Sequence, residues 1–136
     1  MTAAFDSGHD VSIGTLMSRP VLTVDIDESL WDAWQLLFVS GLRHLVVVDA
    51  DGATLGVISD RNILAEVPAT AEHLGSRLVR DVLSMSALIS VNPADDPMVA
   101  AQAMAAGAVE AVPVLEFDGH LVGIVTESDI VRWVAA

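Results

Sequence analysis

The 136-residue sequence contains no cysteine, no tyrosine and no lysine. Without cysteine, the chain can form no disulfide, no thiolate metal site and no cysteine nucleophile. Its 6 basic side chains are all arginine and face 19 Asp and Glu residues, which gives a formal net charge of -13 with neutral histidines. Nucleic acids and anionic membranes both require a positively charged protein surface, so we expect neither as a partner.

Long apolar runs are also missing. Hydrophobic residues make up 53% of the chain, yet Gln102 and Glu110 interrupt the best candidate for a membrane span. Such a span needs roughly 18 uninterrupted apolar residues. Near the N-terminus, Asp6, His9 and Asp10 stand where a signal peptide would have a basic segment followed by an apolar run. We therefore expect a soluble, cytoplasmic protein whose two halves share one core.

The sequence is internally duplicated. Residues 24–64 align with residues 91–131 at a constant offset of 67. The aligned pairs include Ala33 with Ala100, Gln35 with Gln102, Val47 with Val114, Asp51 with Asp118 and Gly56 with Gly123. A constant offset over such a length predicts the duplication of one supersecondary unit.

Each copy is expected to fold as strand, helix, strand, strand, helix. In the first copy, residues 21–24 are typical of a short strand, Ser29 of a helix N-cap and Gly41 of a helix end. Two β-branched runs on either side of Asp51 and Gly52 predict a hairpin. The apolar face of the first helix is predicted to contain Leu30, Ala33, Trp34, Leu37 and Phe38.

The duplication also predicts the domain organisation. We expect an N-terminal tail over residues 1–12, a first repeat over 13–67, a linker over 68–76 and a second repeat over 77–136. Residues 77–83 are predicted to form a helical lead-in to the second repeat. The tail is expected to be poorly ordered, as chain termini often are.

A duplicated βαββα unit that ends in Gly-x-(Ile/Val)-(Ser/Thr)-x-x-(Asp/Asn)-(Ile/Leu) resembles the CBS domain, named after cystathionine β-synthase. The resemblance extends over roughly residues 13–135. It implies an α+β fold of tandem βαββα repeats, a CBS pair with pseudo-twofold symmetry. The segments that carry it are residues 43–49, 56–64, 111–114 and 123–131, together with the entry segment 17–21.

The resemblance also implies a function. CBS pairs commonly bind adenosine-containing ligands such as AMP, ADP, ATP or S-adenosylmethionine in the clefts between the repeats. They regulate other proteins and often form homodimers. We accordingly expect a regulatory sensor with no required cofactor, which dimerises and acts on an unidentified protein target. The alternative is a ligand-free dimerisation or scaffold module. No Ser-His-Asp order, glycine-rich phosphate loop or metal triad is present, so no catalytic activity is predicted.

Two matching segments, Ser59 to Asn62 and Thr126 to Asp129, are the candidate ligand sites. A hydroxyl and backbone amides at a helix N-terminus suit phosphate oxygens, so Thr126 and Ser59 are assigned to phosphate. The resemblance assigns Asp129 to ribose and Asn62 to a weaker ribose contact, since an amide accepts less strongly than a carboxylate. The same segments are also ordinary helix caps, and the two roles are compatible.

Positive charge for a phosphate is expected from Arg43, Arg61 or Arg132, with His44 close by or simply packed at a strand start. The base pocket is expected to be lined by backbone and apolar groups of Arg19, Pro20, Val21, Ser86, Ala87 and Leu88. The three tryptophans are predicted to belong to the core or to an oligomer interface. The four histidines lack ligand spacing and the acidic turns are typical of solvated loops, so no metal site is predicted.

Overall fold

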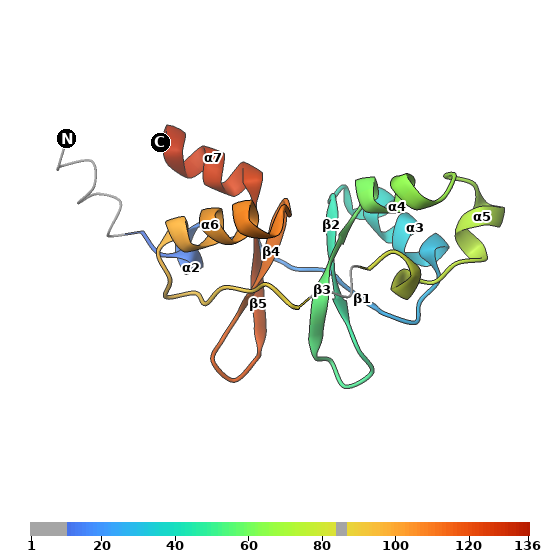
Figure 1. The fold of residues 1–136 in the computed structure, drawn as a ribbon, viewed down its shortest axis with the longest axis horizontal. Coiled ribbons are helices and arrows are strands. Elements are labelled where there is room, and N and C mark those ends of the chain that lie inside the picture. The colour runs from blue at the N-terminus through green and yellow to red at the C-terminus, as the bar shows by residue number, and fades with distance from the viewer. Residues whose placement is uncertain (1–10, 84–86) are drawn as a thin grey trace. The chain divides into compact units, whose positions relative to one another are not determined.

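The computed structural model describes residues 11–83 and 87–136 (Figure 1). The chain divides into two compact units. We call Leu22–Leu88 the first-copy unit, and Met1–Val21 together with Ile89–Ala136 the second-copy unit. Residues 11–21, here called the N-terminal segment, are therefore grouped with the second copy of the repeat and not with the first, which they precede in sequence.

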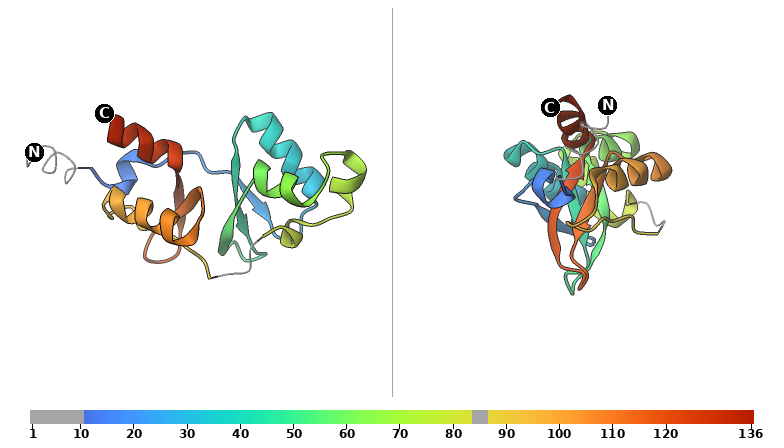
Figure 2. Two further views of the ribbon diagram at one scale, coloured as in Figure 1. Left: turned by 45° about the horizontal axis from the view of Figure 1, so that its top comes forward. Right: turned by 90° about the vertical axis from the view of Figure 1, so that its left-hand side faces the viewer.

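The first-copy unit has the predicted order of elements. They are β1 (Thr23–Asp25), α3 (Leu30–Ser40), β2 (His44–Val48), β3 (Thr54–Ser59) and α4 (Asp60–Glu66). The sheet order is β1-β2-β3, with β1 parallel and β3 antiparallel to β2. Figure 2 shows α3 and α4 on the same face of this sheet. One sheet face covered by two helices is the simplest way to bury the apolar sides of both.

Local sequence explains where α3 begins and ends. The Ser29 hydroxyl accepts a hydrogen bond from the Asp32 amide at 3.1 Å, and Gly41 ends the helix in the left-handed region at φ 73°. The predicted apolar face is only partly correct. Leu30, Ala33 and Leu37 are buried, whereas Phe38 is 83% exposed. The buried stripe of α3 is therefore narrower than its hydrophobic spacing indicated.

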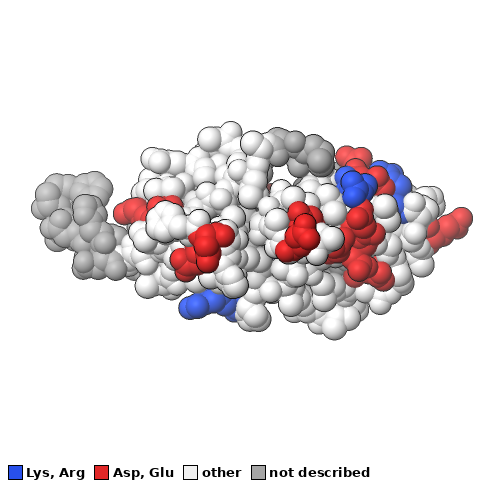
Figure 3. All heavy atoms as spheres, turned by 90° about the horizontal axis from the view of Figure 1, so that it is seen from below, with Lys and Arg blue, Asp and Glu red and all other residues white. Residues whose placement is uncertain are grey.

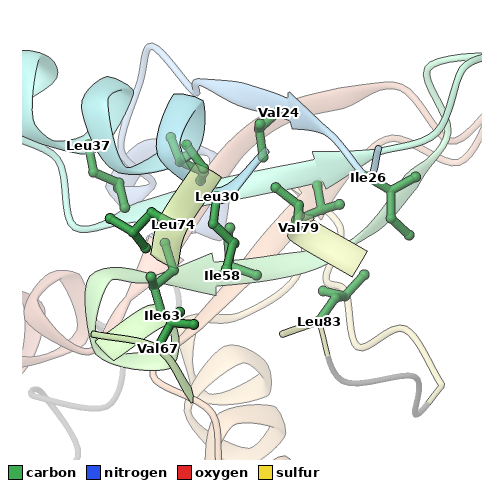
Figure 4. Packing of buried hydrophobic residues seen from close by; sticks show 13 residues of the cluster. Val24, Ile26, Leu30, Leu37, Ile58, Ile63, Val67, Leu74, Val79 and Leu83 are labelled. Carbon is green, nitrogen blue, oxygen red and sulfur yellow. The ribbon is translucent and has the colours of Figure 1, made fainter. Parts of the chain in front are cut away.

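Part of the predicted linker is folded. Residues 71–75 form the short helix α5 (Ala71–Gly75), and Leu74 is fully buried in the first-copy core. The predicted lead-in follows, with the 3-10 helix η1 (Val79–Asp81) contributing buried Val79. Figure 4 shows Leu74 and Val79 among the buried side chains of this core. The members of the cluster are Val24, Ile26, Leu30, Ala33, Leu37, Leu45, Val47, Ile58, Ile63, Val67, Leu74, Val79 and Leu83.

The second-copy unit contains α2 (Ile13–Leu16), α6 (Pro97–Gly107), β4 (Ala111–Leu115), β5 (Leu121–Thr126) and α7 (Glu127–Ala135). β4 and β5 form an antiparallel hairpin. The N-terminal helix α2 contacts α6, α7 and β5. Its Ile13 side chain is fully buried and belongs to the apolar core of this unit. The N-terminal segment is thus a structural part of the second-copy unit.

The second copy departs from the prediction at its first strand. Of the described residues just before α6, only Val91 pairs with β4, in a single parallel bridge to Val114. The bridge is formed by the Val91 amide on the Pro113 carbonyl (3.1 Å) and the Leu115 amide on the Val91 carbonyl (2.8 Å). Pro93 has no amide proton with which to continue such a ladder. Its carbonyl instead accepts from the Gly14 amide at 2.8 Å, which ties the N-terminal segment to this unit.

Acidic side chains are scattered over the face shown in Figure 3, and basic side chains are few there. This distribution agrees with the formal net charge of -13. Of the helices in the described part of the chain, none has the length and apolar character that a membrane crossing requires.

Candidate functional site

The candidate site of the second-copy unit lies where β5 passes into α7. Thr126 is the N-cap of α7, and Asp129 is the third residue of that helix. The Thr126 amide donates to Asp129 Oδ2 at 2.9 Å, and the Asp129 amide donates to Thr126 Oγ1 at 3.3 Å. This reciprocal pair is a capping box, so the capping prediction for this segment is confirmed.

Asp129 is unusual because its carboxylate is buried, with a side-chain exposure of 0%. Besides the Thr126 amide, the carboxylate accepts from the Thr126 hydroxyl at 3.2 Å. The Ser18 hydroxyl lies 3.0 Å from Oδ1 and 3.2 Å from Oδ2, and Arg132 forms an ion pair with Oδ1. A buried charge is tolerated only when it is paired and hydrogen-bonded, and these contacts meet that condition.

Ser18 reaches Asp129 because the N-terminal segment lies against β5. The Ser18 amide donates to the Ile124 carbonyl at 2.8 Å, and the Ile124 amide donates to the Ser18 carbonyl at 3.2 Å. Just before it, Met17 crosses Gly123 so closely that a Cβ there would lie 2.4 Å from the Met17 sulfur. In the second copy, the close contact with Met17 therefore explains why this position, which is glycine in both copies, has no side chain.

The corresponding segment of the first-copy unit has the same geometry with an amide in place of the carboxylate. Ser59 is the N-cap of α4, and its amide donates to Asn62 Oδ1 at 2.9 Å. The Asn62 amide donates in return to the Ser59 hydroxyl at 3.1 Å. The capping prediction is confirmed here as well. Asn62 and Asp129 therefore occupy equivalent positions and differ in charge.

Two arginines and a histidine lie at or beside the first-copy segment. Arg43 Nε lies 3.6 Å from Asp60 Oδ2, with side-chain exposures of 63% and 34%. Arg61 is exposed in the first turn of α4, and His44 pairs with Ser59 across the β2–β3 ladder. An ion pair as exposed as Arg43 with Asp60 is weak, so Arg43 can exchange Asp60 for another anion at little cost.

The second copy has carboxylates at the positions of the first-copy ion pair. Glu110 and Glu127 align with Arg43 and Asp60, and the Glu127 amide donates to the Glu110 carbonyl at 3.0 Å. The backbone contact is therefore the same as that between the Asp60 amide and the Arg43 carbonyl, at 3.2 Å. The backbone is retained while the charge changes, so the two sites differ electrostatically.

The residues predicted to line a base pocket are divided between the units. Arg19 and Pro20 are exposed and Val21 is half-buried in the second-copy unit, whereas Ala87 and Leu88 are exposed in the first-copy unit. Ser86 lies outside the described residues, as does most of the predicted tail, residues 1–10. The assignment of these residues to a base pocket remains a prediction.

Other candidate groups are accounted for within the described residues. Trp31 and Trp34 pack against the first-copy core, as predicted, and Trp133 is half-buried on α7. Over residues 11–83 and 87–136, no cluster of three or more His, Asp or Glu side chains is arranged to hold a metal ion. Sequence reasoning assigned no site role to Ser18 or to Asp60, although both lie in segments that it singled out. Ser18 precedes the duplicated stretch, so the repeat itself carries no signal for it.

The chain is similar to known proteins over nearly its whole length. A CBS domain-containing protein of Dictyostelium discoideum is 34% identical over 128 residues, which cover 88% of each chain. The crystal structure of CBSX2 in complex with AMP matches with a TM-score of 0.72 at 26% identity, covering 92% of this chain and 96% of that one.

A CBS domain pair crystallised with 5′-methylthioadenosine and S-adenosyl-L-methionine has a TM-score of 0.78 at 24% identity, with coverages of 92% and 96%. Other curated relatives are much longer. The chain spans only 22% to 26% of the length of several of them, which include enzymes and a magnesium transporter.

The CBS domain family model matches residues 13–69 and again residues 79–136. These two matches contain the two copies recognised in the sequence, 24–64 and 91–131. Together with the paired folds, they show that this chain belongs to the CBS domain family.

Proposed function

We propose that this chain is a regulatory module that binds an adenosyl ligand and performs no chemistry on it. The observation that carries the proposal is the buried carboxylate of Asp129 at the start of α7. The AMP complex of CBSX2, at 26% identity, supports the choice of ligand class. The regulatory character follows from the family to which both repeats belong.

The chemistry of the second-copy site suits a ribose. A carboxylate accepts hydrogen bonds strongly and can take both hydroxyls of a ribose at once. Asp129 is assigned this role, and Thr126 with the first amides of α7 is assigned to a phosphate. The first-copy site is assigned the weaker ribose contact through Asn62. There, Arg43 and Arg61 supply the positive charge that a phosphate needs.

A ligand can regulate only through its differential affinity for two arrangements of the protein. We propose that the two arrangements differ in the surface offered to an unidentified protein target, and that the module acts as a homodimer. The enzymes and the transporter among the longer relatives contain this type of module as a minor part of their length.

A thermal-shift panel of AMP, ADP, ATP, S-adenosylmethionine and NADH tests the proposal. A ligand that binds the folded state raises Tm by mass action, so at least one adenosyl ligand should do so in a saturable way. The matched control is 2′-deoxy-AMP, which lacks one of the two hydroxyls assigned to Asp129 and should bind much more weakly. No shift at millimolar concentration of any of the five compounds would contradict the proposal.

A ligand-free scaffold is the second candidate function. It is favoured by one observation: the Asp129 carboxylate already has donors from its own unit. The same panel separates the two candidates, because a scaffold predicts no shift with any nucleotide. Its oligomeric state, measured by light scattering, should then also be indifferent to all five compounds.

A further inference from the structure

The Asp129 carboxylate has no acceptor capacity to spare. A carboxylate offers about four lone-pair directions. In this structure they receive the Thr126 amide, the Thr126 hydroxyl, the Ser18 hydroxyl and the Arg132 guanidinium. A ribose that donates both of its hydroxyls to Asp129 must therefore displace two of these donors.

The four donors differ in how readily they leave. The Thr126 amide belongs to the capping box of α7, and the Thr126 hydroxyl comes from the same N-cap residue, so the loss of either donor would disturb the start of the helix. The Ser18 hydroxyl can rotate away while its backbone stays bound to Ile124 by two hydrogen bonds. The Arg132 side chain is 68% exposed, and water can replace its contact with the carboxylate. Ser18 and Arg132 are thus the donors that a ligand would displace.

Both of these donors also share one oxygen. Arg132 pairs with Oδ1, and the shorter of the two Ser18 contacts, 3.0 Å, is to Oδ1 as well. Both Thr126 contacts are to Oδ2, which holds the cap together. Apart from the longer Ser18 contact to Oδ2, 3.2 Å, the exchangeable donors therefore lie at Oδ1 and the donors of the cap at Oδ2.

We propose that Ser18 and Arg132 are intramolecular competitors of the ligand: they occupy Asp129 Oδ1 in the free protein, and the ribose hydroxyls displace them. This inference rests on the proposed function and adds a device that sets the affinity of the site. It also changes the role of Arg132, which the sequence assigned to phosphate. Ligand binding then releases Ser18 in the N-terminal segment and Arg132 on α7, so the contacts of both elements change when the site is occupied.

Calorimetric titration of AMP and of adenosine into Ser18→Ala and Arg132→Ala tests the inference. Removing a competitor that holds one hydrogen bond should tighten binding by about fivefold, for both ligands and in both variants. A phosphate-binding Arg132 predicts the opposite pattern, in which the alanine variant binds AMP more weakly and adenosine unchanged. The comparison of the two ligands therefore separates competition from phosphate recognition.

The chain offers matched controls for both substitutions. Thr15→Ala removes an exposed hydroxyl from the same N-terminal segment, where it donates to the Ser12 carbonyl at 2.7 Å. Arg77→Ala removes an arginine that pairs with Asp81 in the first-copy unit, 3.4 Å away. Neither substitution touches Asp129, so both controls should bind AMP and adenosine with the affinity of the unmodified protein.

Each outcome bears on the inference. If the unmodified protein binds AMP and neither Ser18→Ala nor Arg132→Ala binds more tightly, competition is refuted while the proposed function stands. Binding that becomes measurable only in the two variants would support competition strongly. If no form of the protein binds any adenosyl ligand, the proposed function fails and the competition falls with it.

Discussion

At the scale of single residues, the main contrast is between Asp129 and Asn62. Both are the third residue of a helix, and both return a side-chain oxygen to the amide of the N-cap residue, at 2.9 Å in each case. The cap therefore needs an acceptor but no charge. The cap does not need the negative charge of Asp129, and this is the structural reason for assigning the carboxylate to ligand binding.

The first prediction concerns Asp129→Asn. We expect the free energy of unfolding to change by about 1 kcal/mol or less, because an asparagine oxygen can serve the cap as it does at Asn62. Stabilisation by adenosyl ligands should be lost, because the carboxylate acceptor is gone. Urea unfolding with and without AMP measures both effects. Asp129→Ala is a poorer test, since it would also remove the cap acceptor and cost about 1–2 kcal/mol.

The reciprocal substitution Asn62→Asp is the complementary test. It gives the first-copy site the carboxylate that the second-copy site has, within the same capping geometry. We expect tighter binding of adenosyl ligands to Asn62→Asp, measured by calorimetry. An Asp129→Asn protein that keeps the full ligand-induced stabilisation would show that the ribose assignment is wrong.

At the scale of elements, residues 13–17 and residues 79–83 are equivalent segments, here called the lead-ins, that pack in the same way against the second-copy unit and the first-copy unit respectively. In the second-copy unit, the Ile13 amide donates to the Asp95 carbonyl at 2.9 Å. In the first-copy unit, the Val79 amide donates to the Glu28 carbonyl, also at 2.9 Å. Each lead-in then passes over the glycine that the two copies share. An element that completes a unit thus comes from outside the duplicated stretch.

The second prediction tests the close contact between Met17 and Gly123 with the substitution Gly123→Ala. The new Cβ would lie 2.4 Å from the Met17 sulfur and 2.9 Å from Met17 Cγ, so the N-terminal segment must shift. Overpacking of this kind is expected to cost about 1–3 kcal/mol of unfolding free energy, measured by urea denaturation. Met17→Ala in the same chain should recover part of that loss, and additive losses in the double variant would refute the steric explanation.

The third prediction concerns acid stability and the lead-in of the first-copy unit. The Leu78 amide donates to Asp81 at 2.8 Å, and this hydrogen bond, with the nearby Arg77, holds the pKa of Asp81 below its ordinary value. A lowered pKa in the folded state means that the stabilisation is present above the unfolded pKa, about 3.9. It is lost as the pH falls through the folded pKa.

Asp81→Asn keeps an oxygen for the Leu78 amide and removes only the ionisable group. We expect the urea midpoint of this variant to fall less steeply below about pH 4 than that of the unmodified protein. Asp51→Asn, in the exposed turn between β2 and β3, is the control. Equal acid sensitivity of the Asp81 variant and the unmodified chain would contradict the assignment.

At the scale of the whole molecule, the amino-acid composition predicts which surfaces the chain associates with. Hydrophobic residues make up 53% of the chain, and several large apolar side chains remain exposed, among them Phe38 at 83% and Phe117 at 94%. Apolar groups left in water favour association with another surface. The strongly negative charge opposes contact with nucleic acids and with anionic membranes.

The fourth prediction is that the chain forms a homodimer. Light scattering coupled to size-exclusion chromatography should give twice the chain mass of 14.3 kDa at micromolar concentration. Raising the salt concentration should strengthen the association, because it screens the repulsion between two chains of charge -13. A mass of one chain at every concentration and salt level would refute the dimer.

The sequence by itself determined the features that depend on neighbouring residues or on the repeat. These include the duplicated order of elements, the caps at Ser59 and Thr126, and the glycine turns of both hairpins. Caps and turns are local hydrogen-bonding solutions, so their residue types are visible in a short window. The family followed from the joint occurrence of these signals twice at one spacing.

Only the tertiary structure decided which groups surround the Asp129 carboxylate and which segments complete each unit. Ser18 reaches Asp129 across a sequence separation of 111 residues, and the residues around Ser18 do not predict this contact. The hydrogen bond from the Gly14 amide to the Pro93 carbonyl, 2.8 Å long, likewise joins residues that are far apart in sequence. Contacts of this kind arise from packing between distant segments. The affinity of the proposed site is therefore a property of the folded unit and not of its motif.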